Sequence, residues 1–104
     1  MDENNSIQLF EDRKIRTAWD EEQEEWYFSV QDVVAVLAES SDPKQYIKKM
    51  RTRDPELSAN WGTICTPVQM PAADGKMRKI QAANTEGLLR IIQSIPSPKA
   101  EPFK

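Results

Sequence analysis

Positive charge is concentrated in one short segment near the middle of the chain. Five basic side chains fall within ten residues: Lys44, Lys48, Lys49, Arg51 and Arg53. If this segment is helical, positions 44, 48 and 51 share one face, because residues four and seven apart stack above one another. Such a row of cations can follow a phosphate backbone, where each neutralised phosphate releases counterions. The segment therefore predicts a surface that binds nucleic acid.

A second basic cluster follows a predicted turn. Asp74 and Gly75 form a pair that tolerates positive φ and favours a hairpin, and Lys76, Arg78 and Lys79 come directly after it. A basic two-stranded ribbon is narrow enough for the major groove of DNA. The two clusters together predict double-stranded DNA as the partner, with phosphate contacts from both. Two alternatives stay open, since both clusters could be ordinary solvated surface, or could bind an acidic protein.

Aromatic side chains offer a second kind of contact with nucleic acid. Trp19 and Trp61 could stack on bases. In so small a domain, however, a tryptophan more often belongs to the core or anchors an interface. We therefore assign neither tryptophan to the predicted DNA-binding surface.

Residues suited to catalysis are scarce. The chain has no histidine, so its single cysteine, Cys65, lacks the partner of a Cys–His nucleophile, and structural zinc is excluded by ligand count. The acids between Asp20 and Glu25 match no calcium loop, and three glycines form no phosphate-binding loop. We expect no enzyme activity, no metal and no cofactor, with a nuclease as the least favoured class. Cys65 is expected to be an inert packing thiol.

Charge is distributed unevenly along the 104 residues. The formal net charge is −3, which argues weakly against nucleic-acid binding. However, residues 1–25 contain nine acidic and three basic residues, whereas residues 44–104 contain eleven basic and five acidic residues. A single cysteine, the lack of a visible signal peptide and the lack of a membrane-length apolar run predict a cytoplasmic protein without a membrane segment.

The N-terminal third reads as strands followed by a helix. We expect a disordered tail over residues 1–6, strands at 7–10, 14–19 and 26–30, and an acidic loop at 20–25. Ser29 is placed to cap the next helix, and Asp32 lies near its positive end. A stripe of apolar residues then predicts its buried face: Val30, Val33, Val34 and Leu37.

The remainder alternates between helix and strand signals. Asp42 and Pro43 start a helix that should run to about residue 52, with Tyr46, Ile47 and Met50 inward. Residues 55–63 look irregular, and strands at 64–70 and 77–83 flank the hairpin turn. The prolines of the first strand indicate that it lies at an edge of the sheet or that they mark its end. Thr85 is expected to cap a last helix, and another should begin at residue 99. The inward stripe of that last helix is Leu88, Ile91, Ile92 and Ile95. The predicted fold is a small α+β domain.

Three stretches resemble the Bro-N domain, which is found in phage antirepressors and baculovirus repeated-ORF proteins. From Trp26 to Val34 an aromatic strand runs directly into an amphipathic helix. At residues 84–92 a strand ends and an Asn/Glu-Gly pair opens a helix, and residues 98–104 follow a P-x-A-x-x-F-K pattern. Residues 61–66 are similar to prophage-type bacterial members. The resemblance covers roughly residues 6–104.

The resemblance implies a DNA-binding α+β domain at the N-terminus of a larger antirepressor, acting in transcription regulation. We therefore expect one domain over residues 1–104, truncated before a C-terminal domain. It implies no catalytic residues. The alternative is an interaction module that grips a repressor without touching DNA, with the acidic loop at 20–25 facing a basic repressor surface. A homodimer would suit operator binding, although no residue indicates one. Residues 38–41 replace the family's usual glycine-containing turn, which predicts a longer helix there.

Overall fold

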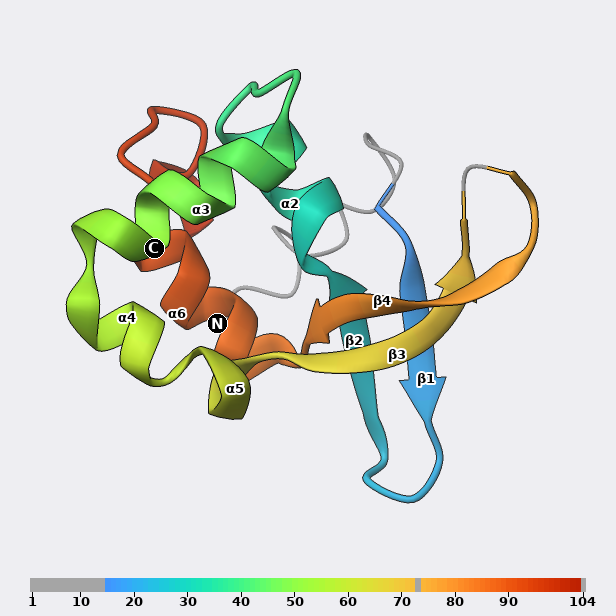
Figure 1. Ribbon diagram of the computed structural model, residues 1–104. Helices are drawn as coiled ribbons and strands as arrows, with labels where there is room; N and C mark the ends of the chain where they lie inside the picture. Colours follow the sequence, from blue (N-terminus) through green and yellow to red (C-terminus); the bar gives the residue numbers. More distant parts are fainter. Residues whose placement is uncertain (1–14, 73, 104) are drawn as a thin grey trace.

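Strands and helices are mixed along the chain in the computed structural model, which describes residues 15–72 and 74–103 (Figure 1). The strands are β1 (Thr17–Asp20), β2 (Glu25–Ser29), β3 (Thr66–Pro71) and β4 (Met77–Ala83). The helices are α2 (Val30–Leu37), α3 (Pro43–Arg53), α4 (Pro55–Ala59), α5 (Trp61–Ile64) and α6 (Thr85–Gln93), with a 3-10 turn η1 (Glu101–Phe103). The predicted α+β class is confirmed. The tail expected at 1–6 and the strand expected at 7–10 lie outside the described residues.

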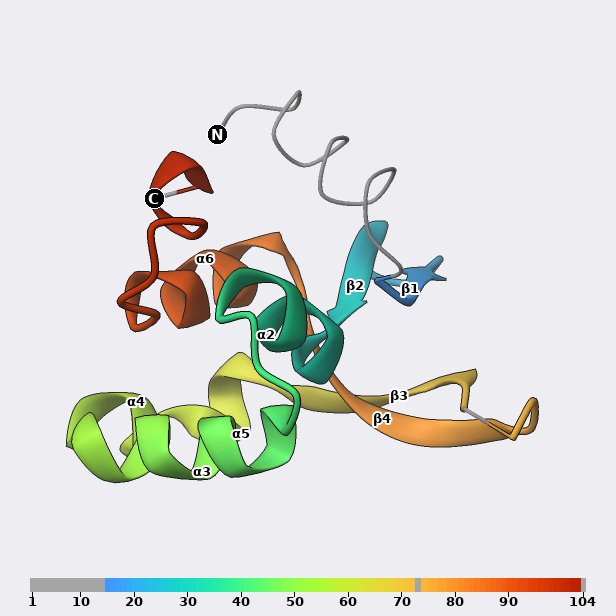
Figure 2. The ribbon, with the colours of Figure 1, turned by 90° about the horizontal axis from the view of Figure 1, so that it is seen from above.

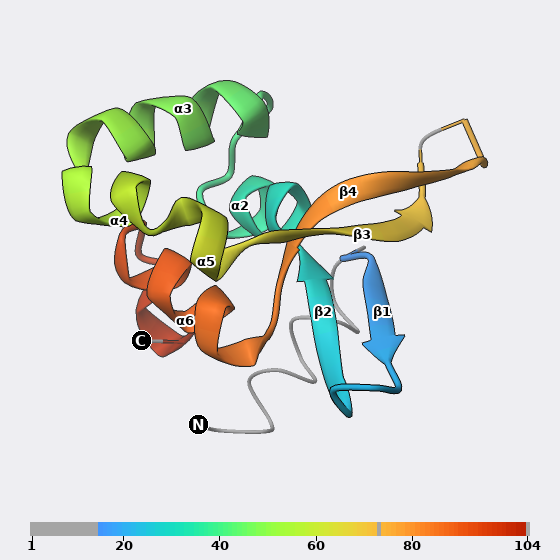
Figure 3. The same ribbon diagram turned by 60° about the horizontal axis from the view of Figure 1, so that its bottom comes forward.

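The sheet consists of two antiparallel hairpins that share a short junction. Its strand order is β1-β2-β4-β3. Within the hairpins, β1 pairs with β2 from Thr17 to Asp20, and β3 pairs with β4 along its whole length. Between the hairpins, β2 and β4 pair only through Phe28 and Ser29. The hairpins therefore diverge from this junction (Figure 3). The edge position predicted for the proline-containing strand is confirmed, since β3 ends the strand order.

Arg16 ties the two hairpins and α2 together. Its Nε and Nη2 atoms donate to the two carboxylate oxygens of Asp32 over 2.7 and 2.8 Å, and its backbone N–H donates to the same carboxylate over 2.9 Å. Its Nη1 donates to the carbonyl of Pro71, at the end of β3, over 3.1 Å. The bond to Asp32 raises the pKa of Arg16 above its ordinary value, although partial burial opposes this. Asp32 thus lies in the first turn of α2 as predicted, and also holds Arg16.

The helix α2 begins as predicted and ends earlier than predicted. The Ser29 hydroxyl accepts from the backbone N–H of Asp32, and the four residues of the predicted stripe are all buried. The helix stops at Leu37, so the expectation of a longer helix was wrong. Glu39 has a φ of +52°, a left-handed conformation that glycine adopts more easily. Glu39 therefore makes the turn that ends α2, in a conformation that is costlier for it than for glycine.

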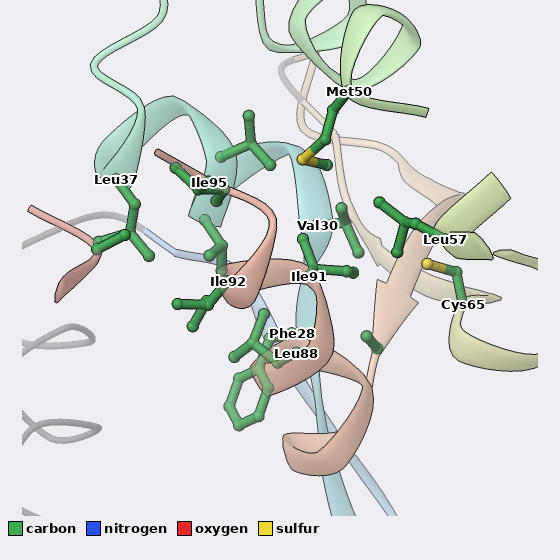
Figure 4. Packing of buried hydrophobic residues seen from close by; sticks show 14 of the residues in the cluster. Phe28, Val30, Leu37, Met50, Leu57, Cys65, Leu88, Ile91, Ile92 and Ile95 are labelled. Carbon is green, nitrogen blue, oxygen red and sulfur yellow. The ribbon is translucent and has the colours of Figure 1, made fainter. Parts of the chain in front are cut away.

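The core lies where α2 and α6 pack against the sheet junction. Figure 4 shows Val30 and Ile91 in its middle, with Met50 and Leu57 entering from the neighbouring helices. All four side chains are fully buried. The predicted stripe of the last helix is buried too, although Ile95 lies just beyond the end of α6. The packing of these apolar faces fixes the positions of α3 and the β3–β4 hairpin relative to each other.

Four sequence-based expectations are corrected. Residues 55–63 are helical rather than irregular, because Asp54 caps α4 through the N–H of Leu57 over 3.0 Å and Leu57 and Trp61 are buried. Consequently β3 begins at residue 66, not 64. Asn84, not Thr85, caps α6, since its side-chain oxygen accepts from the N–H of Gly87 over 2.9 Å. The helix expected from residue 99 is, in its described part, a single 3-10 turn.

Candidate nucleic-acid interface

The helix α3 is positioned by its cap and its apolar side. The Asp42 carboxylate accepts from the N–H of Gln45 over 3.2 Å, and Pro43 occupies the first turn. Met50 is fully buried, while Tyr46 and Ile47 are partly buried against the core, as predicted. Because these side chains face inward, the basic residues of α3 are directed to the surface.

Three of the α3 cations line a shared groove. Lys44, Lys48 and Arg51 border a hollow of about 320 Å³, whose lining also includes Ser58 from α4. This confirms that positions 44, 48 and 51 share one face. Lys49 and Arg53, four residues apart, form a second exposed row along the same helix. The helix α3 therefore carries exposed cations on two neighbouring rows.

The carboxylate of Asp54, which directly follows α3, is engaged elsewhere. Asp54 accepts from the Ser94 hydroxyl over 3.0 Å and pairs with Arg90 over 3.4 Å, in addition to capping α4. The hydrogen bond from the Leu57 N–H is the main cause that lowers the pKa of Asp54. Among residues 15–72 and 74–103, no carboxylate forms an ion pair with any of the five α3 cations. The positive charge of α3 is therefore not neutralised within the described part of the chain.

Arg51 differs from its neighbours because it rests on an aromatic ring. Its guanidinium carbon lies 5.0 Å from the centroid of the Trp61 ring. Trp61 is itself buried, so its core role is confirmed, and Arg51 is held in place by a cation–π contact. Close by, burial raises the pKa of the Cys65 thiol to about 12, which the Arg51 charge only partly opposes. Cys65 is therefore an inert packing thiol, as predicted.

The tip of the β3–β4 hairpin has the predicted turn chemistry. Gly75 has a φ of +83°, and the N–H of Ala72 donates to the carbonyl of Lys76 over 2.8 Å. Arg78 forms an exposed ion pair with Asp74, and its hydrogen bond is the main cause that lowers the pKa of Asp74. Lys76 and Lys79 are exposed and have no ion-pair partner among the described residues. Arg78 is thus partly neutralised, while the two lysines are not.

The structure does not merge the two basic clusters. The helix α3 and the β3–β4 hairpin lie in one layer, but the hairpin tip reaches away from the helices (Figure 2). The acidic loop at 20–25 lies at the end of the other hairpin, away from both (Figure 1). The predicted residues therefore form two separate cationic patches at opposite ends of one layer.

An exposed aromatic pair was not assigned from the sequence. Trp19 and Trp26 face each other across β1 and β2, with ring centroids 5.3 Å apart at an interplanar angle of 62°. Each is about half exposed, 48% and 49% respectively. The sequence does contain a signal for this pair, because Trp19 and Trp26 stand directly before and after the acidic loop and so face each other in a hairpin. By the alternation of a strand Trp26 lies on the same face of β2 as the buried Phe28, but it is half exposed because the hairpin extends beyond the core at this point.

No group of three or more acidic or cysteine side chains within residues 15–72 and 74–103 is arranged to hold a metal ion. No helix in the described ranges is long and apolar enough to cross a membrane.

Comparison with known proteins gives one match. The family model of the BRO family, N-terminal domain, matches residues 14–104. Neither the search of curated proteins nor the search of solved structures found a match. The matched range includes all the strands and helices described above, and it confirms the Bro-N resemblance.

Proposed function

Because the chain belongs to the family of BRO N-terminal domains, we propose that it is a DNA-binding regulatory domain of an antirepressor-type protein. In this proposal α3 contacts the phosphates of double-stranded DNA, and Lys76, Arg78 and Lys79 at the hairpin tip make further contacts. The proposal assigns no catalytic residue.

The observation that carries the proposal is the unpaired charge along α3. Lys44, Lys48 and Arg51 line one groove, and no described carboxylate pairs with them. Surface lysines that serve only solubility are commonly interspersed with acids. Here the uncompensated charge lies on one helix, which favours binding of a polyanion through released counterions.

The test is a DNA titration of the Lys48→Glu and Lys49→Glu double variant. We expect a loss of affinity of at least tenfold at low salt and a salt slope smaller by about 2, because about one counterion is released for each phosphate contact. Both side chains are exposed, so thermal unfolding should be unchanged. An unchanged affinity would remove α3 from the binding surface.

A matched control separates local contacts from net charge. Lys48→Glu and Lys99→Glu change the net charge equally, but Lys99 pairs with Glu39 at a distance of 3.7 Å and is not part of α3. We expect only Lys48→Glu to weaken binding. Equal losses in both variants would mean that overall charge, rather than this helix, controls the affinity.

A protein-interaction module is the second candidate, favoured by the exposed Trp19–Trp26 pair. Aromatic side chains are enriched at protein interfaces, and acidic side chains beside them would complement a basic partner. In this alternative the loop at 20–25 faces a basic repressor surface and DNA is not contacted. Passage over heparin and over immobilised repressor distinguishes the two: retention on heparin at physiological salt supports the first candidate, and retention only on the repressor supports the second.

A further inference from the structure

One face of the β3–β4 hairpin is exposed along its whole length. Residues paired across the two strands share a face, and the register pairs Gln69 with Lys79. The neighbouring pairs on that face are Pro67 with Gln81 and Pro71 with Met77. All six of these side chains are exposed. By contrast, Met70 and Ala82 on the opposite face are fully buried, so the exposed row points away from the domain.

The exposed row has the chemistry of base recognition. A glutamine amide can bond both N6 and N7 of adenine, a lysine can bond O6 and N7 of guanine, and an apolar side chain can contact the methyl group of thymine. The row supplies glutamine amides from Gln69 and Gln81, an ammonium group from Lys79 and an apolar side chain from Met77. Neither glutamine amide has a hydrogen-bond partner within the described residues, and Met77 is 59% exposed. These side chains are therefore available to a ligand.

The spacing of the row also fits a duplex. Gln69 and Gln81 are diagonal neighbours across the two strands, so roughly 7–8 Å separates them. This is about two base-pair steps of roughly 3.4 Å each. The largest extent of the domain is 32 Å, which corresponds to about nine base pairs at the same rise. A single copy would thus cover roughly one turn of DNA.

Other occupants fit this face less well. Pro67 and Pro71 lack the N–H groups that a further strand would need along the edge of β3, which disfavours addition of a peptide strand. The row contains no aromatic side chain for stacking on single-stranded bases. The row also has no carboxylate to attract a basic protein. Asp74 lies in the turn, outside the row, and is paired with Arg78.

We propose that this face of the β3–β4 hairpin enters the major groove and reads base edges, with Gln69, Lys79 and Gln81 as the specificity-determining residues. The inference rests on the proposed function, since duplex DNA must bind in the first place. In this arrangement α3, in the same layer (Figure 2), contributes affinity through phosphates, and the hairpin face contributes sequence preference.

The experiment uses the full chain and a library of randomised 20-base-pair duplexes. Duplexes selected by the unmodified protein are compared with scrambled duplexes by fluorescence anisotropy at one fixed salt concentration. We expect the Gln69→Ala and Gln81→Ala double variant to lose at least tenfold of the affinity ratio between selected and scrambled duplexes. Its affinity for the scrambled duplex should stay within about twofold, because the phosphate contacts remain.

Gln93→Ala, at an exposed position of α6, is the matched control and should leave the ratio unchanged. If the double variant keeps the full ratio, or if selection yields no preferred sequence while Lys48→Glu still weakens binding, base reading by this face is refuted and the DNA-binding proposal stands. If no duplex binds at all, both proposals fail together.

Discussion

Replacement of Arg16 is expected to weaken the junction between the two hairpins. Arg16→Ala removes two hydrogen bonds to the Asp32 carboxylate and one to the Pro71 carbonyl. Charge-assisted hydrogen bonds contribute about 1.5–3 kcal/mol each when they are shielded from water. Here the side chains of Arg16 and Asp32 are 30% and 17% exposed, so solvent screening reduces the sum. We expect the free energy of unfolding to fall by about 2–3 kcal/mol.

Circular dichroism during thermal unfolding is the assay. A loss of this size should lower Tm by about 10–20 °C in a domain of this length. Arg16→Lys should recover only part of it, because lysine lacks the planar fork that bonds both carboxylate oxygens. The matched control is Arg78→Ala, which breaks the exposed pair with Asp74 and should cost under about 0.5 kcal/mol. Equal losses for Arg16→Ala and Arg78→Ala would refute the reasoning.

Two further predictions concern α6 and the buried thiol. A Cβ at Gly87 would lie 2.7 Å from the Ile64 carbonyl oxygen, so Gly87→Ala should destabilise the domain by about 1–3 kcal/mol. Gly62→Ala, with open space around the new methyl group, should not, and urea unfolding of both variants checks this. Burial raises the pKa of Cys65 from 9.0 in the ordinary thiol to about 12, so its neutral form favours folding. That contribution is complete below pH 9 and is lost as the pH rises toward 12. Between pH 8 and pH 10.5 the free energy of unfolding should therefore fall by about 2 kcal/mol more for the unmodified chain than for Cys65→Ala. Equal pH dependence would contradict the assigned burial.

Several local signals in the sequence were sufficient because they act between near neighbours. Asp42 followed by Pro43 predicted the start of α3, since a capping oxygen and a fixed φ both operate within one turn. Asp54 followed by Pro55 is the same signal, although residues 55–63 were expected to be irregular. The two helices that follow are five and four residues long, below the length at which helices form unaided. They exist because Leu57 and Trp61 are buried against the core.

The candidate interface, too, could be predicted from the sequence only in part. The composition of the two basic clusters, and the shared face of Lys44, Lys48 and Arg51, follow from residue type and helical spacing. Their separation at opposite ends of one layer does not, because it depends on how the β3–β4 hairpin leaves the core. The exposed row of Gln69 and Gln81 could not be assigned either, since alternation along a strand does not say which face is covered.

The sequence by itself determined the longer helices, most of the strands, their apolar faces and the two concentrations of positive charge, because periodicity, caps and turns operate over a few residues. Only the tertiary structure decided which of those faces meet. The contacts of Arg16 join residues 16 and 55 positions away, and they hold the two hairpins where they diverge. Contacts at such separations depend on the packing of the whole core, and that packing leaves one face of the β3–β4 hairpin and the Trp19–Trp26 pair open to a partner.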